Sequence, residues 1–135
     1  MAKPPLHRIL LVDDEADIRQ VARIALEAVG GFQVHECSSG FAAPAAVAEF
    51  APQLVLMDVM MPGRDGPETL KALRATPGLP PVPVVFMTAK VQPQEVAAFH
   101  EAGALDVIAK PFDPMTLAQT VRQIWERSGA KGTDS

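Results

Sequence analysis

The feature that most constrains the fold is the alternation of short apolar runs with segments of helical periodicity. Uninterrupted runs rich in branched residues are typical of strands that are covered on both faces. On this basis we predict five strands, at residues 8–12, 33–36, 54–57, 82–87 and 105–108. Because helical segments separate them, the order β-α repeated five times predicts an α/β fold, a doubly wound five-stranded parallel sheet flanked by five helices.

The expected helices follow from the spacing of apolar residues and from the positions of proline and glycine. The first carries one apolar stripe and ends at Gly30-Gly31; the stripe comprises Ile18, Val21, Ala22, Ala25, Leu26 and Val29. Three more are expected over 41–50, 68–75 and 94–102. Pro114 is predicted to open the last one, with Leu117, Val121, Ile124 and Trp125 on its inner face. We therefore divide the chain into an extension (1–5), one domain (6–128) and a flexible tail (129–135).

Composition favours one water-soluble domain. Apolar residues make up 48% and charged residues 21% of the 135, values that are ordinary for a folded domain of this length. The single cysteine, Cys37, excludes an internal disulfide and a zinc cluster, and suits a reducing compartment. With a net charge of −4, no dense basic cluster and no long apolar span, we expect a cytoplasmic chain that binds neither nucleic acid nor membrane.

Reactive side chains follow four of the five predicted strands. Asp13 and Asp14 come directly after the first strand, Asp58 after the third, Thr88 after the fourth and Lys110 shortly after the fifth. In open parallel sheets the working site lies at the carboxyl ends of the strands, near the point where the strand order reverses. Three carboxylates, a hydroxyl and an amine are therefore expected to converge at one edge of the sheet.

The charges of these groups narrow the chemistry. Carboxylates that lie close together repel one another unless cations compensate them. Lys110 can neutralise one, and a hard divalent cation such as Mg²⁺ (or Mn²⁺) can neutralise the others while keeping water ligands that a phosphate can displace. With the metal in place, Asp58 is suited to attack a phosphoryl group, while the lysine and the hydroxyl stabilise its oxygens.

Four sequence blocks then match one family in order and spacing. They are Leu10-Leu11-Val12-Asp13-Asp14-Glu15, Leu54-Val55-Leu56-Met57-Asp58-Val59-Met60-Met61-Pro62-Gly63-Arg64-Asp65-Gly66, Val85-Phe86-Met87-Thr88-Ala89 and Ala109-Lys110-Pro111-Phe112. Over residues 6–128 the chain resembles the receiver domains of response regulators in two-component signalling. One block alone is weak evidence, whereas four in register are highly specific. The resemblance implies the flavodoxin-like receiver fold.

The resemblance also implies a role for each matching residue. Asp58 accepts a phosphoryl group from a histidine kinase or a histidine phosphotransfer protein. Asp14, Asp58 and the backbone carbonyl of Met60 bind Mg²⁺ directly, and Asp13 holds it mainly through water. Lys110 contacts the phosphoryl group, and Thr88 moves to hydrogen-bond it. The Lys110-Pro111 peptide bond corresponds to one that is cis in the family, which aims the lysine into the site.

Three positions bear on how such a switch works in this chain. Val107 stands where many receivers carry Tyr or Phe, and a valine has no ring to move between exposed and buried states. Output is then expected to pass through the fourth helix or loop shifts, or the chain serves as a phosphate sink. Met60 and Lys90 flank the site, and we expect their side chains to set the lifetime of the phosphorylated form.

Simpler interpretations remain for the individual residues. Asp13 and Asp14 are candidates for a helix cap, Thr88 for the cap of the next helix, and Lys110 for a surface charge. For the whole chain, the alternatives are a degenerate receiver that binds partners without phosphorylation and an aspartyl-phosphate phosphohydrolase. The leading prediction is a stand-alone receiver, monomeric or weakly dimeric, whose downstream protein target is unknown. It is either a complete single-domain regulator or a piece of a longer protein.

Overall fold

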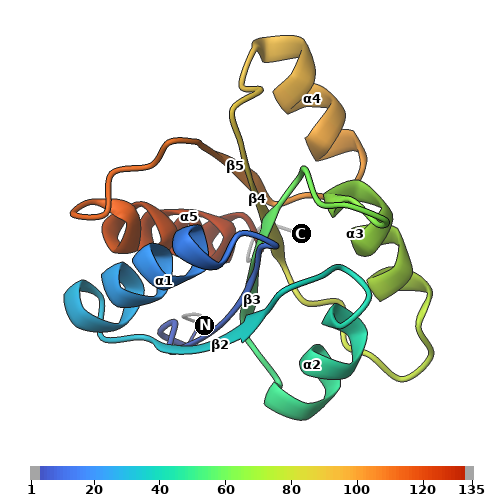
Figure 1. The fold of residues 1–135 in the computed structure, drawn as a ribbon, viewed down its shortest axis with the longest axis horizontal. Helices are drawn as coiled ribbons and strands as arrows, with labels where there is room; N and C mark the ends of the chain where they lie inside the picture. The colour runs from blue at the N-terminus through green and yellow to red at the C-terminus, as the bar shows by residue number, and fades with distance from the viewer. Residues whose placement is uncertain (1–3, 133–135) are drawn as a thin grey trace.

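The computed structural model describes residues 4–132 and confirms the predicted α/β architecture (Figure 1). Five parallel strands form one sheet in the order β2-β1-β3-β4-β5. The strands are β1 (Arg8–Val12), β2 (Gln33–Cys37), β3 (Leu54–Asp58), β4 (Val84–Thr88) and β5 (Asp106–Ala109). The helices are α1 (Ala16–Ile24) with its π-helical continuation η1 (Ala25–Val29), α2 (Ala43–Phe50), α3 (Gly66–Ala75), α4 (Pro93–Glu101) and α5 (Leu117–Gly132).

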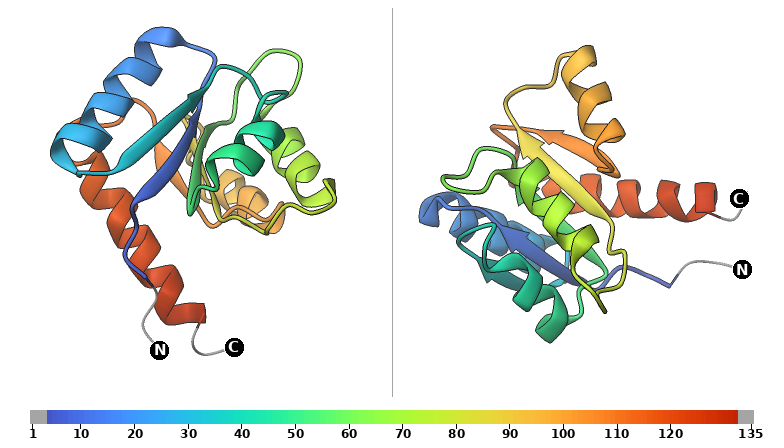
Figure 2. Two further views of the ribbon diagram at one scale, coloured as in Figure 1. Left: turned by 90° about the horizontal axis from the view of Figure 1, so that it is seen from below. Right: turned by 90° about the vertical axis from the view of Figure 1, so that its right-hand side faces the viewer.

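Helices cover both faces of the sheet. α1 and α5 lie on one face, and α2 and α3 lie on the other (Figures 1 and 2). Alternating side chains of the strands divide the core accordingly, since Ile9 and Leu11 pack with Leu26 and Val121 while Leu10 packs on the opposite face. Burial on both faces explains why the inner strands β1, β3 and β4 are apolar runs rather than alternating sequences. β2 lies at the edge of the sheet and alternates between exposed and buried residues. Within residues 4–132, no helix combines the length and the apolar character needed to cross a bilayer.

The strand register decides which residues meet at the carboxyl edge of the sheet. Val12 of β1 pairs with Met57 of β3, so the next residues, Asp13 and Asp58, emerge side by side. The strand order reverses between β1 and β3, because the chain goes from β1 to β2 on one side and continues from β3 to β4 and β5 on the other. Ligands bind open α/β sheets at this kind of switch point.

The predicted stripe of the first helix is wrong at two positions. Ala22, Ala25 and Leu26 are buried, but Val21 and Val29 are exposed. The small side chains of Ala22 and Ala25 let α1 lie close to the sheet, which leaves only a narrow strip in contact and Val21 outside it. Val29 ends the π-helical segment, whose wider turn changes the phase of the stripe. The predicted stop is confirmed by Gly31, which has a φ of +71°.

The predicted bounds of the last helix are also wrong. Pro114 lies in a turn, and α5 begins at Leu117. The Asp113 side chain accepts a hydrogen bond from the Met115 backbone N–H at 2.9 Å, a local arrangement that competes with helix formation. At the other end the helix continues through Gly132, so residues 129–132 are helical rather than part of a loose tail. The two glycines of this segment are poor helix formers, but extending an existing helix adds one hydrogen bond for each residue fixed. Residues 1–3 and 133–135 of the predicted extension and tail lie outside the described residues.

Candidate functional site

A lysine bridges two buried carboxylates at the switch point. Asp13, just after β1, is fully buried, and Asp58, the last residue of β3, is 3% exposed. The Lys110 Nζ atom lies 3.1 Å from Asp13 Oδ2 and 3.2 Å from Asp58 Oδ1. Lys110 is therefore an internal cation of the site, and the simpler interpretation of it as a surface charge is wrong.

The electrostatics of these three groups leave the site with an excess of negative charge. Burial raises the pKa of Asp58, the charge of Asp13 raises it further, and Lys110 together with a hydrogen bond from the Met60 backbone opposes both effects only in part. Burial lowers the pKa of Lys110, but its hydrogen bonds and charge interactions with Asp13 and Asp58 outweigh that effect and raise it. Lys110 therefore stays charged, but its one positive charge does not neutralise all the carboxylates of the site.

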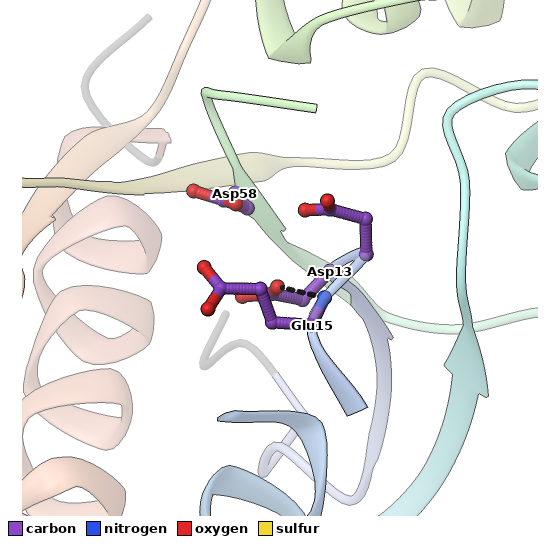
Figure 3. A group of neighbouring side chains, drawn as sticks. Asp13, Glu15 and Asp58 are labelled. Carbon is purple, nitrogen blue, oxygen red and sulfur yellow. Dashed lines mark hydrogen bonds between the residues drawn. The ribbon is translucent and has the colours of Figure 1, made fainter. Parts of the chain in front are cut away.

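Asp13 is held by the surrounding backbone. Its N–H donates to the Cys37 carbonyl at 3.1 Å, and its Oδ1 accepts from the Glu15 N–H at 2.9 Å (Figure 3). The residue that precedes the first turn of α1 is Glu15, and its side chain makes no capping hydrogen bond. The interpretation of Asp13 and Asp14 as a simple helix cap is therefore wrong.

The acidic cluster has the composition of a cation site. Ligand oxygens of Asp13, Asp14, Glu15 and Asp58 all lie within 4.8 Å of one another, and Figure 3 shows three of these side chains gathered between β1, β3 and the start of α1. Asp14 Oδ1 is buried and has no hydrogen-bond partner within residues 4–132. A buried, unpartnered carboxylate oxygen beside other carboxylates fits a hard cation with oxygen ligands.

Glu15 is a member of this cluster that the sequence analysis did not place in the site. The one sequence feature that pointed to Glu15 was its position directly after two aspartates that follow a strand. A surface glutamate at the start of a helix is also favoured by the helix dipole, so adjacency alone does not separate the two roles. The geometry adds Glu15 to the groups that influence a bound cation.

Thr88 and Lys90 lie together at the end of β4. Thr88 is 2% exposed, and its Oγ1 accepts a hydrogen bond from the Lys90 N–H at 3.0 Å. Its carbonyl accepts from the Lys110 N–H at 2.9 Å, which ties β4 to the start of the loop that carries the lysine. The residue before α4 is Gln92, so Thr88 does not cap that helix.

The loop after Asp58 brings Met60 to the surface beside the acceptor. Met60 is 65% exposed, while the following Met61 is buried. Gly63 has a φ of +80°, and Asp65 forms a capping box with Glu68 that starts α3. At Gly66 a side chain would meet the Asp58 carbonyl at 2.9 Å. These residues shape the loop, which is the geometric role that their types predict.

The remaining predicted positions surround this centre. The Lys110-Pro111 peptide bond is cis. Val107 is half-buried in β5, where it pairs in register with Phe86 of β4. Beside the lysine lies an open, mostly apolar depression, lined by Glu15, Ile18, Val21, Ala89, Lys110, Pro111 and Phe112.

A doubly wound sheet that gathers carboxylates and a half-buried lysine at its switch point defines a flavodoxin-like domain that handles a charged group there. The chain belongs to the response regulator receiver domain family, whose sequence pattern matches residues 9–122. It is a phospho-accepting signalling switch of the two-component type. The resemblance found in the four sequence blocks is thereby confirmed.

Relatives and solved structures agree with this assignment. The DNA-binding response regulator MtrA of Mycobacterium tuberculosis is 42% identical over 115 residues, which are 85% of this chain and 49% of MtrA. The phosphate regulon regulator PhoB of Pseudomonas aeruginosa is 35% identical over 121 residues, 90% of this chain and 52% of PhoB. The chain thus spans about half the length of these curated relatives. The chemotaxis response regulator CheY4 of Vibrio cholerae superposes with a TM-score of 0.79 at 28% identity, covering 88% of this chain and 98% of CheY4.

Proposed function

We propose that Asp58 accepts a phosphoryl group from the phosphohistidine of a histidine kinase or a histidine phosphotransfer protein. The observation that carries this proposal is the position of Lys110 Nζ, 3.2 Å from Asp58 and 3.1 Å from Asp13. From this position Lys110 can contact a phosphoryl group on Asp58 while it keeps its contact with Asp13. We infer a cytoplasmic location from this class of partner.

The reaction is a transfer between two nucleophiles. A carboxylate oxygen of Asp58 attacks the phosphorus, the P–N bond breaks, and the bonding pair stays on the imidazole nitrogen as it leaves. Attack requires the ionised carboxylate, and the positive charge of Lys110 favours that form against the effect of burial. Lys110 and the Thr88 hydroxyl then donate hydrogen bonds to the phosphoryl oxygens.

Asp14, Asp58 and the Met60 carbonyl are the proposed direct ligands of Mg²⁺ (or Mn²⁺), and Asp13 is proposed to act through water. The unpartnered Asp14 Oδ1 and the clustered carboxylate oxygens support this set. When bound, the cation neutralises charge on the cluster and on the equatorial phosphoryl oxygens. Glu15, whose carboxylate belongs to the same cluster, is a further acidic neighbour of the proposed cation.

The output of the switch is a change in protein binding. Thr88 is proposed to leave its contact with the Lys90 N–H and to turn toward the phosphoryl group. Val107 cannot report this movement as an aromatic ring does, so α4 and the neighbouring loops are the proposed route. In α4 no described residue is buried, which leaves this helix loosely packed and suited to shift. The only reactions that the domain catalyses are its own phosphorylation and dephosphorylation.

The two alternatives have less support. A phosphohydrolase of the aspartyl-phosphate type needs a second acid two residues after the nucleophile, and that position is the exposed Met60. A degenerate receiver does not need the charges that the site keeps, and Asp13, Asp58 and Lys110 are all present and in contact. We therefore retain phosphorylation as the function.

The experiment is incubation with acetyl phosphate and Mg²⁺, read by intact mass. The wild-type chain should gain one phosphate, and Asp58→Ala or chelation of the metal should abolish the gain. A folded wild-type chain that binds Mg²⁺ but gains no phosphate would favour the degenerate receiver. Continuous release of inorganic phosphate from small phosphate esters in the absence of a phosphohistidine partner would favour the phosphohydrolase.

A further inference from the structure

We propose that Arg19 is a positioning residue of the metal site: it ties the Asp13-Asp14 peptide to β2 and thereby fixes the direction of the Asp14 carboxylate. The proposal rests on the proposed magnesium chemistry and adds a residue to it. Arg19 lies on α1 and does not belong to the acidic cluster.

The guanidinium of Arg19 makes two directed contacts. Its Nη1 donates to the Asp13 carbonyl at 2.7 Å, and its Nε donates to Glu36 Oε1 at 3.1 Å. The side chain is only 17% exposed, so water competes weakly for both contacts. A planar guanidinium with two partners of fixed position has little freedom to move.

Glu36 is itself anchored. Its second oxygen, Oε2, accepts from Arg23 Nη1 at 2.7 Å, and Arg23 Nε pairs with Glu27 at 3.1 Å. The hydrogen bond from Arg23, opposed in part by burial and supported by Arg19, lowers the pKa of Glu36 and keeps the carboxylate charged. Arg19 and Arg23 of α1 thus both hold Glu36 of β2, and of the two only Arg19 also donates to the Asp13 carbonyl.

The contact with the Asp13 carbonyl matters because that carbonyl belongs to the peptide plane that joins Asp13 to Asp14. Rotation of this plane would redirect the Asp14 side chain. The N–H of Asp13 is held by the Cys37 carbonyl, and Arg19 holds the carbonyl. Within residues 4–132 Asp14 Oδ1 has no partner of its own, so the backbone must orient it. Arg19 therefore acts on the cation through Asp14 rather than by contact.

The alternative is that Arg19 only joins α1 to β2. Arg23 is the matched control for that alternative, since it contacts the same glutamate from the same helix but does not contact the Asp13 carbonyl. Loss of either arginine should weaken packing between α1 and β2. Only loss of Arg19 should weaken the cation site.

The test measures Mg²⁺ affinity by calorimetry and metal-free melting temperature for wild type, Arg19→Ala, Arg19→Lys and Arg23→Ala. Arg19→Ala should weaken Mg²⁺ binding about tenfold, the low end of what supporting residues of metal sites contribute. Arg23→Ala should lower the melting temperature to a similar degree but leave Mg²⁺ affinity nearly unchanged. Arg19→Lys should restore part of the affinity, because one ammonium can still donate to the Asp13 carbonyl. In an Asp14→Asn background, Arg19→Ala should have no further effect on Mg²⁺ affinity.

Wild-type Mg²⁺ affinity in folded Arg19→Ala would overturn the proposal and leave the proposed function intact. Equal losses of affinity in Arg19→Ala and Arg23→Ala would overturn it too, because a packing role would then suffice. If Arg19→Ala does not fold, Arg19→Met decides, because methionine keeps an apolar stem but has no donor for the Asp13 carbonyl. Mg²⁺ affinity equal to that of the wild type in Arg19→Met, alongside a lowered melting temperature, would refute a positioning role. Absence of Mg²⁺ binding by the wild-type chain would refute the proposed function together with this inference.

Discussion

Asp13 and Asp14 are neighbours of the same chemical type, yet their surroundings differ. The backbone N–H, the backbone carbonyl and both carboxylate oxygens of Asp13 have partners within the domain. In the part of the chain that the structure describes, Asp14 Oδ1 has none. Asp13 is therefore an anchor for Lys110 and the loop, whereas Asp14 is free to serve a ligand. Residue type alone does not distinguish the two positions, because the difference in their contacts arises from strand register and from Arg19.

The lifetime of the phosphorylated form should depend on the side chains at 60 and 90. Met60 is exposed beside the acceptor and offers no strong hydrogen bond to an attacking water. Met60→Asn should speed phosphate loss about fivefold, since one hydrogen bond contributes about 1 kcal/mol. Lys90→Glu should speed it as well, because it replaces a shielding cation with an acceptor. Decay of phosphate followed by intact mass measures both rates.

Lys71→Glu is the control, since Lys71 is an exposed residue of α3 outside the acidic cluster. It should leave the lifetime unchanged. Rates that are equal for wild type, Met60→Asn and Lys90→Glu would show that neither side chain governs hydrolysis.

α1 links the acceptor site to the surface. Its first turn begins at the acidic cluster, Arg19 reaches back to Asp13, and Ile18 and Val21 line the apolar depression beside Lys110. The sequence predicted the helix and its end but put Val21 on the buried stripe. The error has a physical cause, because periodicity alone does not show how closely a helix with small inner side chains approaches a sheet. Val21 adjoins Ile18, Pro111 and Phe112 in the depression beside Lys110, and a contiguous apolar patch of this kind suits a docking partner.

Val21→Asp should slow phosphoryl transfer from a protein donor but leave transfer from a small-molecule donor unchanged. A charge in this depression would impede docking of a phosphohistidine domain, while acetyl phosphate needs no such surface. We expect transfer from a phosphorylated histidine phosphotransfer protein to slow by at least about fivefold, the cost of an important interface residue. Ile24→Asp, also exposed on α1 but outside the depression, is the matched control. Equal slowing with both donors would contradict a docking role for Val21.

The contact between α1 and β2 should make stability depend on pH. The hydrogen bond from Arg23, with burial opposing and Arg19 assisting, lowers the pKa of Glu36 below its ordinary 4.5. Ionised Glu36 therefore stabilises the fold above that pH, and the contribution is lost as the pH falls through the folded-state pKa. The free energy of unfolding of the wild type should exceed that of Glu36→Gln by up to about 1 kcal/mol at neutral pH, and the difference should shrink at an acidic pH well below 4.5. Urea unfolding at both pH values measures it, and a difference that does not change with pH would refute the assignment.

For the whole molecule, the predictable part is what local pattern and topology determine. All five strands were predicted from the sequence, and a parallel sheet necessarily collects the residues that follow its strands at one edge. The approach of Asp13, Asp58 and Lys110 was therefore predictable from sequence. The contacts of Arg19 were not, because Glu36 belongs to another strand and the Asp13 carbonyl carries no signal in its side chain. The start of α5 was missed for a similar reason, since the Asp113 turn competes locally with the helix.

The central claim is that phosphate is carried on Asp58 and on no other side chain. An acyl phosphate is reduced by borohydride to an alcohol, which converts the modified aspartate to homoserine. After phosphorylation with acetyl phosphate and Mg²⁺, peptide mass spectrometry should therefore find homoserine at position 58 alone, and none in a sample treated with chelator. Reduction at Asp13 or Asp14 in its place, or a phosphate that resists borohydride, would contradict the account.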